Sequence, residues 1–164
     1  MSDPFTVFTV ALSAATDPQA PLAALHALTL ATVGARLFTV TTVEDAGRLA
    51  RRSYTSEPVA YPLSGTKSVE PSRWNTIVLE DRQCFVANTL QDISSVFPDH
   101  ALIGSLGLGS VVNMPVILRG QVATTLNLLD VEGYYSPERV AFIKDRLTLP
   151  TLAAQLAHDA LRRG

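Results

Sequence analysis

The chain has 164 residues, of which 47% are hydrophobic and 17% are charged. This length and composition suit one domain with a buried core and exclude an intrinsically disordered chain. The formal net charge of −2 gives no electrostatic reason to expect nucleic acid or a membrane surface as a partner. Cys84 is the only cysteine, which excludes an intrachain disulfide and a thiolate metal cage.

The sequence also carries no recognisable targeting or membrane-spanning segment. The N-terminal MSDPFTVFTV lacks the basic stretch and long apolar run of a secretory signal. No uninterrupted apolar run approaches the ~20 residues that a membrane-spanning helix needs. We therefore expect a cytoplasmic protein.

Residues 1–33 are predicted to form two helices. Each begins at an Asp-Pro pair, at positions 3 and 17, where the aspartate can cap the helix and the proline fits its first turn. In the first helix, Phe5, Phe8 and Leu12 lie at helical spacing on one face. The second helix is rich in alanine, which favours helix, and Gly34 is placed to end it.

The next part of the chain is predicted to supply the first strands of a sheet. β-Branched and alternating residues indicate strands at residues 35–43, 49–55, 61–63 and 84–87. A short helix is expected at residues 74–79. Arg48, Arg51 and Arg52 form a basic cluster too short for a phosphate-tracking stripe, so we expect solvated strand residues.

The remaining elements are a helix, a hairpin and a final helix. Residues 93–106 are predicted to be mostly helical with an interruption near Pro98. Residues 110–118 and 122–129 read as two strands joined by a tight turn at Arg119-Gly120. Ser136 and the proline after it then start a helix, which Pro150 should kink or split.

The linear pattern SVVNMPV, then RGQVATTLNLL, then YSPE resembles the closing half of a GAF domain. The resemblance implies an α+β fold with a GAF-like antiparallel β-sheet. The N- and C-terminal helices would lie on one face, and short helices and loops would form a pocket on the other. It implies one GAF-like domain over residues 1–164, with N-terminal helices in 1–33, sheet and pocket elements in 35–135, and a C-terminal helix in 136–164.

Six polar or aromatic residues on or beside the pocket-side elements are predicted to bind a ligand: Tyr54, Trp74, Asn88, His100, Ser105 and Asn113. Asn113 sits inside an otherwise apolar strand, where a buried amide needs hydrogen-bond partners. Trp74 has a simple alternative, because a tryptophan on a short helix over a sheet often serves core packing.

Three activities of the resembled family can be compared with these residues. Methionine sulfoxide reduction needs a nucleophilic and a resolving cysteine, and Cys84 stands alone. Cyclic-nucleotide binding would need an ordered set of Asn, Lys, Phe and Asp residues, and the chain has these types without the pattern. His100 lies where some GAF sensors hold haem, although the adjoining Pro98-Asp99 equally indicates a turn or cap with an exposed histidine.

The leading hypothesis is a small-molecule-binding sensory or regulatory domain that acts through self-association or a separate signalling partner, with its cofactor unknown. A homodimer would use the terminal helices, through Phe5, Phe8, Leu12, Leu152 and Leu156, although these residues could equally cover the sheet. The alternatives are a non-catalytic dimeric interaction module with a vestigial pocket, a haem-binding sensor, and a small-molecule enzyme with an unrecognised site. No Ser-His-Asp arrangement or paired carboxylates support catalysis.

Overall fold

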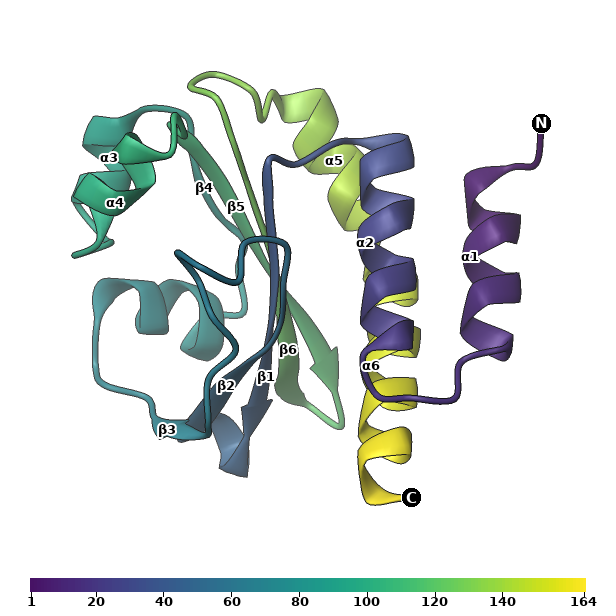
Figure 1. Cartoon of the computed structure of the whole chain (residues 1–164). Helices are drawn as coiled ribbons and strands as arrows, with labels where there is room; N and C mark the ends of the chain where they lie inside the picture. The colour runs from purple at the N-terminus through teal and green to yellow at the C-terminus, as the bar shows by residue number, and fades with distance from the viewer.

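Six antiparallel strands form one sheet in the order β3-β2-β1-β6-β5-β4 in the computed structural model, which describes residues 1–164 (Figure 1). The strands are β1 (Leu37–Glu44), β2 (Leu49–Thr55), β3 (Lys67–Ser68), β4 (Phe85–Ala87), β5 (Ser110–Leu118) and β6 (Gln121–Asp130). The helices are α1 (Pro4–Ser13), α2 (Ala20–Thr32), α3 (Leu90–Ser94), α4 (His100–Ser105), α5 (Pro137–Arg146) and α6 (Thr148–Arg163). A short 3₁₀ turn, η1 (Asp45–Gly47), joins β1 to β2, and a π-helical segment, η2 (Asn75–Glu80), precedes β4.

The long helices lie on one face of the sheet. Figure 1 shows α2 beside α6 against this face, and α1 packed on the outer side of α2, farthest from the sheet. The main core lies between, where Phe38, Leu126 and Leu128 of the sheet are fully buried. The α+β architecture expected from the sequence is therefore confirmed, and α2 is the N-terminal helix that meets the C-terminal one.

The predicted apolar face of the first helix is used within the chain. Phe8 is buried, and Phe5 and Leu12 pack partly buried against the same core, as does Leu152 of α6. Of the five residues considered for a dimer surface, Leu156 alone is exposed, at 45%. None of the helices combines the length and apolarity that crossing a membrane requires.

The predicted break in the last helix occurs at Leu147, where α5 ends and α6 begins. Pro150 is the third residue of α6, and its ring would clash with the carbonyl of Arg146 if the helix ran on unbroken. Leu147 is fully buried at the break, so the two helices stay anchored to the same core.

The third strand is where the sequence-based prediction is wrong. Residues 61–63 form no strand, and the short third strand is β3 at Lys67–Ser68. Pro62 has no N–H to give to a ladder, and Tyr61 ends a turn in which its own N–H donates to the Glu57 carbonyl at 2.8 Å. The Tyr61 side chain instead contacts Asp99, just before α4.

A β-bulge in β2 changes which face its side chains occupy. Arg52 pairs with Thr41 while Tyr54 pairs with Val40, so Ser53 is one extra residue on β2. An extra residue breaks the alternation of faces along a strand. Arg52 therefore points to the face opposite the long helices, whereas Arg51, Ser53 and Tyr54 point towards α2 and α6.

The expectation that the basic cluster is solvated is wrong for two of its three members. Arg51 is only 7% exposed, and it pairs with Glu44 and, at 3.6 Å, with Asp159 of α6. Arg52 is half-buried on the other face, and Arg48 alone is exposed, beside Asp45. Arg51 and Arg52 are consecutive residues of β2, so their side chains lie on opposite faces of the sheet and contact different polar groups.

His158 completes the polar contact between α6 and the rest of the helical layer. Its Nδ1 lies 2.6 Å from the Pro18 carbonyl, so Nδ1 carries the proton and donates it. Its Nε2 lies 3.4 Å from Nη2 of Arg51, which can only donate, so Nε2 must accept. Burial, followed by the charge of Arg51, lowers the pKa of His158, against the opposing effects of Pro18 and Asp159.

We expect this histidine to make the fold less stable in mild acid. Below its ordinary pKa of 6.5 the unfolded chain binds a proton that the folded His158 resists, so the stabilisation present above pH 6.5 is lost as the pH falls. His26, whose pKa burial also lowers, acts in the same direction. Urea unfolding between pH 7.5 and 5.5 should show a flatter pH dependence for His158→Gln, and flatter still when His26→Gln is added; an unchanged slope in the double variant would contradict this account.

Candidate functional site

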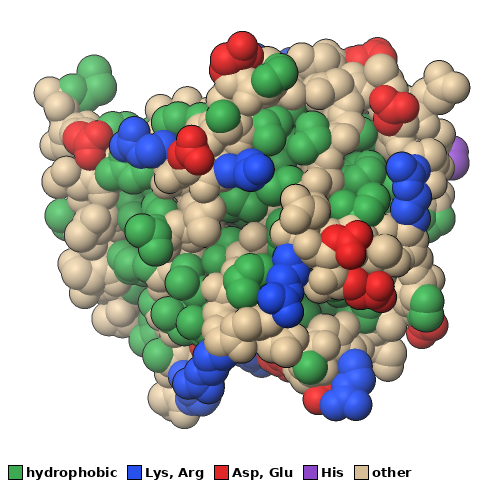
Figure 2. All heavy atoms as spheres, turned by 180° about the vertical axis from the view of Figure 1, so that it is seen from behind, with side chains coloured by type: hydrophobic (Ala, Val, Ile, Leu, Met, Phe, Trp, Pro, Cys, Tyr) green, Lys and Arg blue, Asp and Glu red, His purple; other side chains and the backbone are tan.

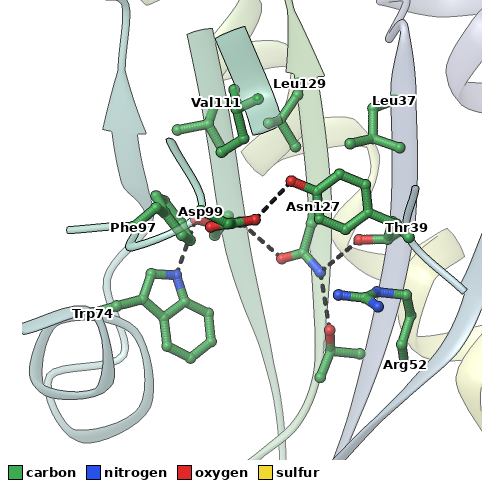
Figure 3. A pocket seen from close by; sticks show the side chains of 13 residues that line it. Leu37, Thr39, Arg52, Trp74, Phe97, Asp99, Val111, Asn127 and Leu129 are labelled. Carbon is green, nitrogen blue, oxygen red and sulfur yellow. Dashed lines mark hydrogen bonds between the residues drawn. The ribbon is translucent and has the colours of Figure 1, made fainter. Parts of the chain in front are cut away.

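A cavity of about 230 Å³ lies on the face of the sheet opposite α2 and α6. Its floor consists of side chains from three neighbouring strands: Leu37, Thr39, Thr41, Val111, Asn113, Asn127 and Leu129. Its walls come from the loops and short helices above the sheet: Arg52, Tyr61, Trp74, Phe97, Asp99 and Ile103. Figure 3 shows these side chains converging from both layers.

A continuous chain of hydrogen bonds crosses the floor of the cavity. The indole N–H of Trp74 donates to Oδ1 of Asn113 at 3.0 Å, and Nδ2 of Asn113 donates to Oδ1 of Asn127 at 2.9 Å. Nδ2 of Asn127 in turn donates to the hydroxyls of Thr39 and Thr41, at 3.2 and 3.1 Å. The chain thus links η2 with β5, β6 and β1.

The tryptophan fixes the direction of every bond in this chain. An indole N–H can only donate, so Asn113 must present its oxygen to Trp74 and its amide group to Asn127. The same orientation passes to Asn127, which presents its N–H groups to the two threonines. The hydroxyls of Thr39 and Thr41 accept these bonds, and their own hydrogens remain available to a molecule in the cavity. The floor is therefore a set of oriented donors.

We expect Trp74→Phe to lower the free energy of unfolding by about 1–3 kcal/mol, because Oδ1 of the buried Asn113 loses its donor. Asn113→Leu should cost at least as much, because it also breaks the bond to Asn127. The double variant should lose less than the sum of the two, since both single changes break the same indole–amide bond. Urea unfolding followed by circular dichroism measures this coupling, and strictly additive losses would show that the indole–amide bond does not stabilise the fold.

The wall of the cavity carries one cation and one anion. The Tyr61 hydroxyl donates to Oδ2 of Asp99 at 2.6 Å, and the guanidinium of Arg52 lies over the Tyr61 ring at 5.1 Å from its centre. Burial, followed by the hydrogen bond to Asp99, raises the pKa of Tyr61, so the phenol stays protonated and keeps donating. Burial lowers the pKa of Arg52, which remains charged at neutral pH.

Two of the six predicted ligand residues line this cavity, namely Trp74 and Asn113. Tyr54 lies on the other face of the sheet, where its hydroxyl contacts Nδ1 of His26 at 3.0 Å. Asn88 exchanges two hydrogen bonds with the backbone of Tyr135 and fixes the loop before α5. It lines a separate hollow beside α5.

The other two predicted residues lie close to the cavity without lining it. His100 is the first residue of α4, and its Nδ1 lies 3.0 Å from the Phe97 carbonyl. Ser105 is exposed at the end of α4 and donates to the Leu102 carbonyl at 2.7 Å. The same short helix does contribute Ile103, and the residues just before it contribute Phe97 and Asp99.

The architecture of the chain matches solved structures over nearly its whole length. The GAF domain of a phosphoenolpyruvate-protein phosphotransferase from Coxiella burnetii superposes with a TM-score of 0.73 at 15% identity, over 97% of this chain and 94% of that one. The GAF domain/HD domain protein from Geobacter sulfurreducens gives 0.68 at 17% identity, over 93% and 99%. The chain has the GAF-domain fold.

Proteins with very different sequences share this fold. The chromophore-binding domain of a bacteriophytochrome from R. palustris matches with a TM-score of 0.65 at 10% identity, over 97% of this chain and 62% of that one. No protein-family model matches the sequence, and no curated protein matches it either. The likeness at these identities shows the fold, and the chemistry has to be argued from the side chains.

Cys84, the only cysteine, does not line this cavity. Cys84 is half-buried against the core on the helical face, and burial raises the pKa of its thiol despite the nearby Lys144. A protonated thiol is a poor nucleophile. No group of three His, Cys, Asp or Glu side chains converges in a way that could hold a metal ion.

Proposed function

We propose that this chain is a sensory or regulatory domain that binds a small organic molecule in the cavity over β1, β5 and β6. The observation that carries the proposal is the oriented floor, in which Trp74, Asn113 and Asn127 direct the hydroxyls of Thr39 and Thr41. Ligand sites are typically apolar hollows with a few placed polar groups, and the leucine and valine side chains around this floor supply the apolar part. The GAF domain of a sensor histidine kinase from Bacillus halodurans shares the fold.

The size of the cavity restricts the ligand. About 230 Å³ is below the roughly 300–1,000 Å³ that is usual for drug-sized ligands. A tetrapyrrole does not fit this space, and His100 contacts the Phe97 carbonyl instead of lining it. A compact metabolite with one or two polar groups fits best.

A route for output runs through the sheet to the last helix. Arg52 lines the cavity, and its neighbour Arg51 contacts Asp159 and His158 of α6 on the other face. A ligand that contacts Arg52 would therefore contact the segment of β2 whose next residue, Arg51, pairs with α6. The ligand can shift α6 only if it prefers one arrangement of β2 and α6 over another. The receiver would be a second copy of the chain or a separate partner.

The proposal is tested by native mass spectrometry of freshly purified protein, followed by a binding screen against metabolite-sized compounds read by the fluorescence of Trp74, the only tryptophan. We expect a retained mass or a compound that changes the fluorescence saturably. Thr39→Val should weaken that binding, and Thr66→Val, on an exposed loop, should not. A retained or screened compound that binds Thr39→Val as well as the parent would place the site elsewhere, and the absence of any binder would refute the proposal.

A further inference from the structure

We infer that the ligand is a small zwitterion, an α-amino acid or close analogue with an apolar side chain. This inference rests on the proposed function, because it names the ligand class of the same cavity. Its basis is a cation, Arg52, and an anion, Asp99, that lie on the same wall and both contact Tyr61, and neither of them forms an ion pair.

Arg52 has unused donors inside the cavity. Its side chain is half-buried and makes one hydrogen bond, from Nη1 to the Pro62 carbonyl at 2.9 Å. A guanidinium has five N–H donors, and no carboxylate lies within ion-pair distance of this one. Figure 3 shows its planar end turned towards Asn127. The combination of guanidinium and hydroxyl donors suits a carboxylate.

Asp99 has unused acceptor capacity on the same wall. It occupies the N-cap position of α4, where an aspartate usually accepts from the helix backbone, yet its side chain makes no capping bond. It turns to Tyr61 instead, and Oδ2 accepts the phenolic hydrogen. A carboxylate has about four acceptor sites, so Oδ1 and part of Oδ2 remain for a donor. An ammonium group supplies three donors and the opposite charge.

A zwitterion satisfies both groups at once. A ligand with a carboxylate alone would leave Asp99 facing a negative charge, and an amine alone would leave Arg52 facing a positive one. In an α-amino acid both charged groups are attached to the α-carbon, and the side chain points away from them. Leu37, Val111 and Leu129 line the inner part of the cavity, where an apolar side chain would be buried.

The test compares matched probes on the intact protein by titration calorimetry and Trp74 fluorescence. The twenty amino acids are screened first, and then an apolar binder such as leucine is compared with 3-methylbutylamine, which lacks the carboxylate, and 4-methylpentanoate, which lacks the amine. We expect an apolar amino acid to bind and each truncated probe to bind at least tenfold more weakly. Equal binding of either truncated probe would overturn the inference.

Substitutions test the binding roles of Arg52 and Asp99 independently of the truncated probes. Arg52→Met and Asp99→Asn should each weaken amino-acid binding at least tenfold, while Arg48→Met, an exposed arginine beside β2, should leave it unchanged. Circular dichroism checks that each variant is folded. If none of the amino acids binds but an uncharged or singly charged compound does, the inference falls and the proposed function stands. If no compound binds at all, both fall.

Discussion

Replacing Phe38 with alanine is expected to lower the free energy of unfolding by about 3–5 kcal/mol. Phe38 is fully buried on β1, at the contact between the sheet and α2. Its ring stacks on His26 with 4.7 Å between ring centres and meets the edge of Tyr54 at 5.6 Å. Alanine would remove this packing and leave a cavity between two layers that are fixed by the rest of the core.

Urea unfolding followed by circular dichroism measures this loss. Leu30→Ala is the matched control, because Leu30 lies on α2 but is 52% exposed, and its change should stay within about 0.5 kcal/mol. For a chain of this length a loss of 3–5 kcal/mol should also lower the Tm by roughly 6–20 °C. Similar losses for Phe38→Ala and Leu30→Ala would mean that α2 does not pack on the sheet as described.

Arg51→Met is expected to lower the free energy of unfolding by about 1–3 kcal/mol. Removing one member of a fully buried ion pair costs roughly 3–5 kcal/mol, because the remaining charge is stranded. Here the partners are partly solvated, with 41% of the Glu44 side chain and 31% of the Asp159 side chain exposed, so the cost is smaller. Methionine keeps much of the side-chain volume, which isolates the charge.

Arg48→Met provides the comparison for this prediction. Arg48 pairs with Asp45 at 2.6 Å, but 75% of its side chain is exposed, so its loss should cost less than about 0.5 kcal/mol. Amide hydrogen exchange should show faster exchange in α6 for Arg51→Met only. If the two variants are equally stable and exchange alike, the contact between β2 and α6 is not held by Arg51.

The local patterns of the sequence predicted most of the fold. The hairpin of β5 and β6, the helix start at Ser136 and the break forced by Pro150 all depend on residues next to one another in the chain. The third strand was misplaced because Tyr61 contacts a residue far away in the sequence: it donates to Asp99, 38 residues further along the chain. Such a contact leaves no periodic signal in the sequence.

The cavity residues that were predicted have a local sequence signal, and those that were missed depend on contacts between distant parts of the chain. Asn113 could be recognised because an amide inside an apolar strand requires partners, and Trp74 because it lies on the short helix expected at residues 74–79. Tyr54 was misplaced by the extra residue at Ser53, because a bulge reverses the alternation that assigns strand residues to faces. Arg52 was missed because no local pattern in β2 shows which face each arginine occupies. Only the folded structure shows that Arg52 faces the cavity while Arg51 faces α6.

Charged side chains of both signs are mixed on one face of the molecule. Figure 2 shows acidic and basic side chains interspersed with hydrophobic ones on the face that it presents, without a continuous area of one sign. Inside the cavity, Arg52 and Asp99 retain donor and acceptor capacity, because Arg52 makes one side-chain hydrogen bond and Asp99 accepts one from Tyr61.

The most direct test of the cavity as a ligand site is a ¹H–¹⁵N NMR titration of the labelled protein with the compounds that bind in the screen. Trp74 is the only tryptophan, so its indole N–H gives one signal, and that N–H is bonded to Asn113 at the cavity floor. We predict that a binder shifts this signal together with the side-chain amide signals of Asn113 and Asn127, with one saturation curve. A binder that saturates while these three signals stay in place would contradict the account.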